Sequence, residues 1–323
     1  MTAVEPTFVY VVGMHRSGTS ALTGLLGALG LTLPPEGDLL AGQPDNPNHY
    51  ESRSLLALND RLLCAAGCTW DAPRPLPPGW DRAPRVAAFD DEARASLSGV
   101  FPGPGSPVWK DPRLCHLLPY WRRIVTRPQA AVLVWRRPEA VARSVVRRNG
   151  TTRSAALALW ERSTADALAG VAGLPVRVVS HDDLLADPAG TAAALADWLS
   201  GVGAAAPAGG WDLPSAAAVV NASLVRAGEG ESGTNVPELD AAVDRLVGLD
   251  GAHDPFPHLQ PLPTTDWGED ILTEVLARRS VERELQRVRS MARFRATAPL
   301  RRLRARMQAR AAGAPAGGVS REG

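Results

Sequence analysis

The stretch Phe8-Val9-Tyr10-Val11-Val12-Gly13-Met14-His15-Arg16-Ser17-Gly18-Thr19-Ser20 decides the fold. Its first five residues are apolar, and their β-branched and aromatic side chains are typical of a buried parallel strand. Residues 21–29 read ALTGLLGAL, which predicts a helix directly after the glycine-bounded turn. A strand, a tight turn and a helix N-terminus direct several backbone N–H groups toward one point, so the stretch predicts a phosphate-binding loop.

The loop departs from that of nucleoside triphosphatases at one position. Gly13 and Gly18 have the expected spacing, and Ser20 occupies the terminal Ser/Thr position. Thr19, however, stands where the lysine of a triphosphatase loop is expected, and the one cation within the loop is Arg16. The sequence therefore predicts binding of a phosphate-like group without the usual handling of ATP.

The overall composition is that of a globular protein in a reducing compartment. The chain has 323 residues, of which 45% are hydrophobic and 21% are charged. Its three cysteines, Cys64, Cys68 and Cys115, are too few and too scattered for a disulfide framework or a structural zinc site. No apolar run approaches the roughly 18 residues of a membrane span, and the N-terminus lacks a signal-peptide pattern. We expect a cytoplasmic protein with no metal.

Four short apolar segments alternate with helical patterns. They lie at residues 7–12, 107–110, 131–135 and 175–180. This alternation predicts an α/β fold with a P-loop-like parallel sheet flanked by helices, in which ligands bind beyond the carboxyl ends of the strands. The loop after Val12, Lys110-Asp111-Pro112-Arg113 and Arg136-Arg137-Pro138 all follow such strands. We therefore expect three cationic loops to meet in one crevice.

We expect three parts along the chain. Residues 1–200 form the core, residues 201–268 complete the domain with Pro- and Gly-rich loops, and residues 269–323 form a basic helical and disordered tail. Twelve arginines stand against two glutamates between Arg278 and Arg310. Val281, Leu285, Val288 and Ala292 recur among them at helical spacing, which fits peripheral contact with an anionic membrane or a self-associating arm. Nucleic-acid binding is not expected, since no recognition motif or aromatic interleaving accompanies the charge.

Two motifs resemble those of sulfotransferases that use 3′-phosphoadenosine 5′-phosphosulfate (PAPS). Residues 13–20 resemble the loop that binds the 5′-phosphosulfate in that family. Arg136, at a strand end, and Ser144, eight residues later on the next helix, resemble the pair that holds the 3′-phosphate. Residues 46–51 and 110–113 resemble further motifs of bacterial carbohydrate-type members, and the resemblance covers roughly residues 7–200.

The resemblance implies a binding role for each loop residue. PAPS is then the donor, and it is bound by His15, Arg16, Ser17, Gly18, Thr19, Ser20, Arg136 and Ser144. Because a sulfuryl group carries less charge than a phosphoryl group, cations and backbone N–H groups suffice without a metal. Arg16 neutralises the 5′-phosphate and the bridging oxygen, a task that suits a guanidinium.

The attacking hydroxyl needs a general base. Glu51 is our first candidate, because the resemblance places an acidic residue there, and Glu36 is the second, twenty residues after Arg16. Further candidates for the base are His15, His49 and His116. Lys110 or Arg113 stabilises the sulfuryl oxygens or orients the base; the alternative is that both belong to an ordinary helix start capped by Asp111.

We therefore predict a sulfotransferase that moves a sulfuryl group by in-line attack onto a hydroxyl of a saccharide, glycolipid or secondary metabolite. The alternatives are a P-loop small-molecule kinase and a catalytically silent nucleotide-binding protein recruited through its basic tail. The expected partner is a small-molecule or glycan acceptor, with homo-oligomerisation left open.

Overall fold

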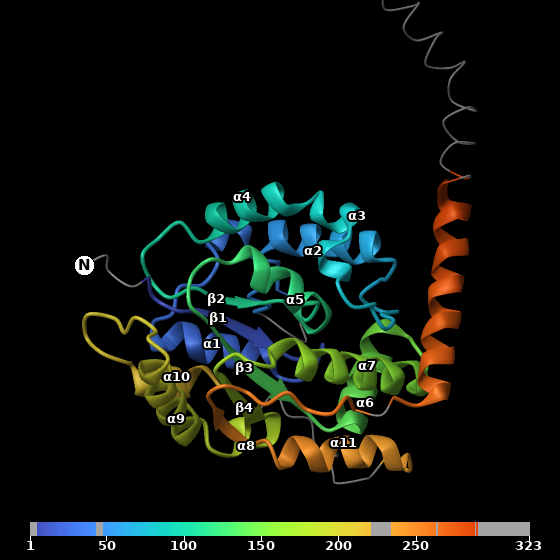
Figure 1. Ribbon diagram of the computed structural model, residues 1–323. Helices are drawn as coiled ribbons and strands as arrows, with labels where there is room; N and C mark the ends of the chain where they lie inside the picture. The colour runs from blue at the N-terminus through green and yellow to red at the C-terminus, as the bar shows by residue number, and fades with distance from the viewer. Residues whose placement is uncertain (1–4, 43–47, 221–233, 263, 288, 290–323) are drawn as a thin grey trace, which may run out of the picture. The chain divides into compact units, whose positions relative to one another are not determined.

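The computed structural model describes residues 5–42, 48–220, 234–262, 264–287 and 289. The chain divides into two compact units, Met1–Val275 and Leu276–Gly323. The first unit contains all the strands of the described residues, and Figure 1 shows its sheet between layers of helices.

The sheet has five strands in the order β2-β1-β3-β4-β5. The strands are β1 (Phe8–Val12), β2 (Val108–Lys110), β3 (Gln129–Trp135), β4 (Val176–Ser180) and β5 (Gly251–His253). The first four run parallel, so that Val11 pairs with Lys110 and Trp135 pairs with Ser180 at one edge of the sheet. The predicted α/β class is confirmed, and the carboxyl ends of these strands meet at a common edge.

One correction concerns the last strand. β5 runs antiparallel to β4 and lies in a Pro-rich segment for which the sequence analysis expected no strand. Its three residues, Gly-Ala-His, have no β-branched or aromatic side-chain pattern, and main-chain pairing with β4 places them in the sheet. The sheet is therefore parallel with one short antiparallel edge.

The side chains of β1 alternate between two cores. Phe8, Tyr10 and Val12 lie in one hydrophobic cluster, whereas Val9 and Val11 lie in the other. The first cluster includes residues of α2 (Arg53–Ala66), α4 (Asp90–Val100), α5 (Leu114–Ile124), α6 (Pro138–Asn149), α7 (Arg153–Val171) and α11 (Pro237–Val247). The second includes residues of α1 (Thr19–Leu29), α8 (His181–Ala186), α9 (Pro188–Gly201) and α10 (Leu213–Val219). This burial on both faces explains why the strand reads as a continuous apolar run.

The remaining elements are short, apart from the C-terminal helix. They are the 3-10 helices η1 (Glu36–Asp38) and η2 (Trp80–Arg82) and the helix α3 (Pro84–Ala87). Residues 266–287 are helical, which agrees with the helix expected from Glu269 onward. The predicted disordered part of the tail lies outside the described residues.

Cys64, Cys68 and Cys115 are free thiols. The described residues contain no group of three or more side chains that could hold a metal ion. Within the same residues, every helix is too short or too polar to cross a membrane.

Candidate active site

The loop between β1 and α1 is held in place by two closely packed glycines. A Cβ on Gly13 would lie 2.3 Å from the backbone oxygen of Val134, and one on Gly18 would lie 2.6 Å from the ring of His181. Gly18 also has a φ of 90°, a conformation that side-chain-bearing residues rarely adopt. Arg16 is one of those rare cases, with a φ of 71°. The glycine spacing therefore reflects tight packing of the loop against β3 and the start of α8.

The N-terminus of α1 opens directly from this loop. Among the described residues, no side-chain hydrogen bond caps it at Gly18. Its first backbone N–H groups and the positive end of the helix dipole are thus available to an anion. Thr19 is buried in the first turn, and its carbonyl accepts a hydrogen bond from Thr23.

Two sequence motifs resemble donor-binding segments, namely residues 13–20 and the pair Arg136 and Ser144. They meet at Arg16. Its Nε donates a hydrogen bond to Oγ of Ser144 on α6, over 2.9 Å. Arg136, directly after β3, donates from Nη1 to the carbonyl oxygen of Arg16 over 3.2 Å. The carbonyl of Arg136 accepts in turn from Nε1 of Trp160 over 2.9 Å. The loop and the β3–α6 segment thus form one connected cationic wall.

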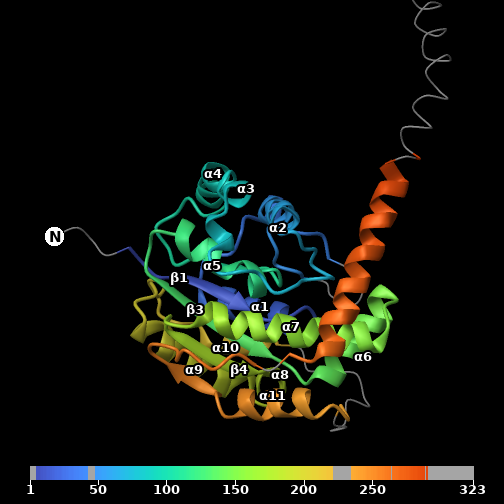
Figure 2. The same ribbon diagram turned by 45° about the vertical axis from the view of Figure 1, so that its right-hand side comes forward.

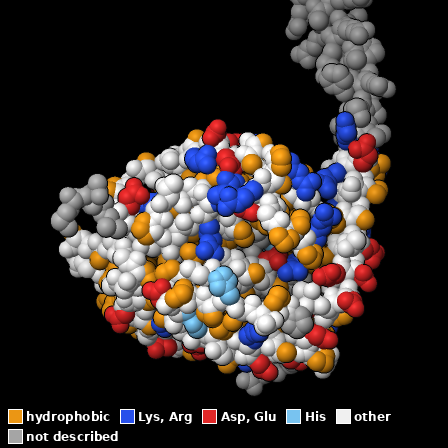
Figure 3. Space-filling model, in the orientation of Figure 1, with side chains coloured by type: hydrophobic (Ala, Val, Ile, Leu, Met, Phe, Trp, Pro, Cys, Tyr) orange, Lys and Arg blue, Asp and Glu red, His pale blue; other side chains and the backbone are white. Residues whose placement is uncertain are grey.

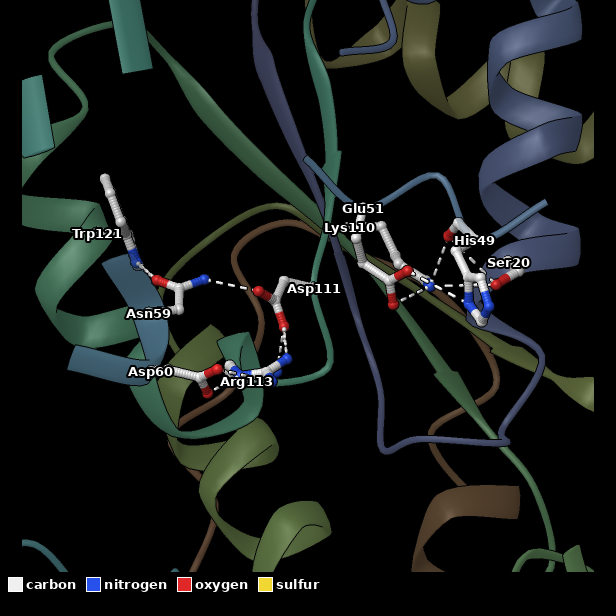
Figure 4. Close-up of polar contacts among 9 residues, drawn as sticks. All are labelled: Ser20, His49, Glu51, Asn59, Asp60, Lys110, Asp111, Arg113 and Trp121. Atoms are coloured by element: carbon white, nitrogen blue, oxygen red, sulfur yellow. Dashed lines mark hydrogen bonds and ion pairs between the residues drawn. The ribbon is translucent and has the colours of Figure 1, made fainter. Parts of the chain in front are cut away.

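Lys110 lies at the carboxyl end of β2, beside β1, and its ammonium group reaches the end of the loop. Nζ donates to Oγ of Ser20 over 3.1 Å, to the carbonyl of His49 over 2.8 Å and to Oε1 of Glu51 over 2.6 Å. Figure 4 shows these three partner residues around Nζ of Lys110. The neighbouring strand therefore supplies a lysine to a loop that has Thr19 in place of its own.

The Lys110–Glu51 pair is almost completely buried. The exposed fractions of the two side chains are 2% and 8%. Burial lowers the pKa of Lys110, and the adjacent carboxylate of Glu51 opposes that shift. Oε2 of Glu51 lies 3.5 Å from Nδ1 of His49. Glu51 and His49 are held next to α2, whose first turn is capped by Ser52 through the backbone N–H of Leu55.

Lys110, Ser20, His49 and Glu51 are called the Lys110 cluster below. Among the described residues, Arg113 does not contact this cluster and takes part in a separate network. Its guanidinium binds Asp60 on α2 over 2.6 Å and Asp111 over 3.2 Å. Asp111 also accepts from the backbone of Arg113 and from Asn59, both over 2.9 Å, and Asn59 accepts from Trp121 over 2.8 Å. These contacts fix the turn between β2 and α5, and with it the residue before the turn, Lys110.

The other candidates for the base lie in different surroundings. Glu36 is exposed on η1, and no contact between its side chain and the Lys110 cluster occurs in the described part of the chain. His116 is buried, with Nδ1 2.7 Å from Asp166 and Nε2 3.4 Å from Ser163. His15 packs on Trp70 with ring centroids 5.0 Å apart. Burial, and then the nearby cations Arg113 and Lys110, lower the pKa of His15, so its neutral form is favoured.

Two residues at the site were not singled out as site residues by the sequence analysis. His181, at the start of α8, packs against Gly18, and Asp182 beside it lies 3.9 Å from Arg137. Their position directly after β4, a fourth strand that ends at the same edge of the sheet, could have indicated them in the sequence. The space-filling view shows several groups of Lys and Arg side chains on the upper half and the centre of one face (Figure 3).

Comparison with known proteins supplies a family description. A sequence model of a protein family, described as the sulfotransferase family, matches residues 6–202. One similar solved structure is the sulfotransferase domain from the Synechococcus PCC 7002 olefin synthase, with 17% identity, a TM-score of 0.41 and coverage of 86% of this chain and 97% of that chain. Another is the sulfotransferase domain from the curacin biosynthetic pathway, with 14% identity, a TM-score of 0.38 and coverage of 84% and 98%. No match was found among curated proteins.

Proposed function

The chain belongs to the sulfotransferase family, and we propose that it transfers a sulfuryl group from PAPS to a hydroxyl of a saccharide, a glycolipid or a secondary metabolite. Membership of the family makes it a transferase of sulfur-containing groups.

The observation that carries the donor assignment is the contact between the two motifs. Ser144 and Arg136 lie 128 and 120 residues from Arg16 in the sequence, and both bind Arg16 directly. A donor with one phosphate on the 5′ side and another on the 3′ side of a ribose needs two anion sites close together. The loop supports the first site and the Arg136–Ser144 segment the second.

The chemistry of the available groups fits such a donor. The uncapped start of α1 offers backbone N–H groups, Arg16 and Arg136 offer forked guanidinium donors, and Lys110 adds a buried ammonium. These groups suit phosphate and sulfate oxygens without a metal ion. PAPS, when bound, supplies a sulfuryl group on a phosphate leaving group.

Glu51 is the proposed general base. One of its oxygens, Oε1, is held by Lys110, while Oε2 is buried and has no hydrogen-bond donor among the described residues. Oε2 is therefore the atom that takes the proton from the acceptor hydroxyl. Lys110 orients the carboxylate of Glu51 and also binds Ser20 at the end of the donor loop. Arg16 and Lys110 stabilise the negative charge that develops on the leaving oxygen. His49, 3.5 Å from Oε2, is the alternative base that this geometry favours.

Calorimetry tests the donor assignment without knowledge of the acceptor. Adenosine 3′,5′-bisphosphate should bind with a Kd in the micromolar range, whereas ATP with magnesium should bind at least about tenfold more weakly, a difference of about 1.4 kcal/mol. A preference for ATP with magnesium would favour a kinase on the same fold. Failure to bind the bisphosphate would remove PAPS as the donor.

A further inference from the structure

The C-terminal helix carries an exposed apolar stripe. Within residues 266–287, Val281 is 67% exposed and Leu285 is 46% exposed. They are four residues apart, so they lie on one face of the helix, one turn from each other. Val281 is the most exposed large apolar residue among the described ones. A stripe of this kind is typical of a helix face that binds an apolar surface.

The same helix carries an excess of positive charge. Arg278 and Arg279 both pair with Glu282, over 3.3 and 3.1 Å, and Arg287 lies 3.8 Å from Glu284. Two glutamates cannot neutralise the four arginines of residues 276–287. After Arg287 the sequence contains nine further arginines and a single acidic residue, Glu322. The tail is thus strongly cationic, while the chain as a whole has a net charge of only +1.

We propose that this helix binds an anionic phospholipid surface, with Val281 and Leu285 inserted among the lipids and the arginines against the headgroups. An apolar stripe beside a basic face is the pattern of helices that lie in a membrane interface. Each arginine near an anionic leaflet adds about 1 kcal/mol of attraction. The combination makes binding depend both on the anionic lipid and on the two apolar side chains.

Charge decides against two other partners. A second copy of the helix would bring two arginine-rich segments together, and their repulsion opposes self-association. A nucleic acid would satisfy the arginines but would leave Val281 and Leu285 in water. An anionic lipid surface satisfies the charge and the apolar stripe together.

Vesicle flotation of the full-length protein tests the proposal. We expect flotation with vesicles that contain about one third phosphatidylserine, and at least about tenfold weaker binding to pure phosphatidylcholine. Binding should also fall when the salt is raised from roughly 0.1 M to 1 M, since the Debye length shrinks from about 10 to 3 Å.

Paired variants separate insertion from simple charge attraction. The double variant Val281→Ser/Leu285→Ser keeps the charge of the helix and should bind anionic vesicles at least about tenfold more weakly, because two apolar side chains no longer insert among the lipids. The matched control is Val247→Ser, which changes a 53% exposed valine of α11 and should bind like the wild type. Binding of adenosine 3′,5′-bisphosphate by each variant reports whether the catalytic unit remains folded.

Four results would overturn the proposal. The first is no flotation with anionic vesicles, and the second is equal flotation of the wild type and the Val281→Ser/Leu285→Ser variant. The third is binding of single-stranded RNA with no binding of vesicles. The fourth is concentration-dependent self-association that the same double variant abolishes, again without vesicle binding.

Discussion

Replacing Lys110 by methionine removes the cation from a buried pair and should lower the free energy of unfolding by about 3–5 kcal/mol. The carboxylate of Glu51 loses its 2.6 Å partner, and the carbonyl of His49 loses a donor at 2.8 Å. Both side chains of the pair are at least nine-tenths buried, so water cannot replace the lost ammonium. The variant therefore leaves an uncompensated buried charge.

A double-mutant cycle isolates the pair from the rest of the site. Lys110→Met and Glu51→Gln are each expected to destabilise the fold, whereas the double variant leaves no unpaired charge. The double variant should therefore be more stable than the sum of the single effects predicts, by about 1.5–3 kcal/mol. The exposed pair of Arg94 and Asp91, 3.1 Å apart, provides the control, and Arg94→Met should change stability by less than about 1 kcal/mol.

Urea denaturation followed by tryptophan fluorescence near neutral pH measures all four proteins of the cycle and the control. Equal m-values would show that the same surface is exposed on unfolding in each variant. If the effects of Lys110→Met and Glu51→Gln add within about 0.5 kcal/mol, the two side chains are not coupled and the reasoning is refuted.

Three further predictions concern the same candidate site. Ser144→Ala removes the acceptor from Nε of Arg16 and should weaken binding of adenosine 3′,5′-bisphosphate by about 0.5–1.5 kcal/mol in calorimetry; unchanged affinity would exclude this contact from the donor site. Glu51→Gln should abolish sulfuryl transfer and keep bisphosphate binding, whereas the exposed Glu36→Gln should be as active as the wild type, and the opposite pattern would move the base to Glu36. Because the pKa of His15 is lowered in the native state, the unfolded chain takes up a proton below pH 6.5 that the native state does not. The free energy of unfolding should therefore fall by up to about 1 kcal/mol when the pH is lowered by one unit from 6.5. Urea denaturation at these two pH values should show a smaller fall in the free energy of unfolding for His15→Gln than for the wild type. An identical fall would contradict the lowered pKa of His15.

The sequence predicted the parallel part of the sheet because those strands are buried on both faces. Each reads as a mainly apolar run, with Arg177 of β4 as the charged residue inside one, and the strands begin within two residues of the predicted positions. β5 was missed because three residues of an edge strand carry no such run. β5 lies in the sheet because its main chain pairs with that of β4. A partner so distant in the sequence produces no local pattern in residues 251–253.

The sequence also indicated which strand ends would carry the candidate site but not which cation would contact Glu51. Lys110 and Arg113 were equivalent candidates, since both follow the same strand. In the structure, Asp60 on α2 and Asp111 hold Arg113, while Lys110 binds Glu51. That distinction depends on where α2 packs, which side-chain periodicity within residues 110–113 cannot reveal.

The central claim is that the wall formed by Arg16, Arg136 and Ser144 recognises a nucleotide with a 3′-phosphate. Calorimetry of adenosine 3′,5′-bisphosphate and of adenosine 5′-monophosphate, on the wild type and on Arg136→Ala, tests it most directly. We predict that the wild type prefers the bisphosphate and that Arg136→Ala weakens its binding by about 2–4 kcal/mol while changing the monophosphate little. Equal affinity of the wild type for both nucleotides, or an equal loss for both in Arg136→Ala, would contradict the claim.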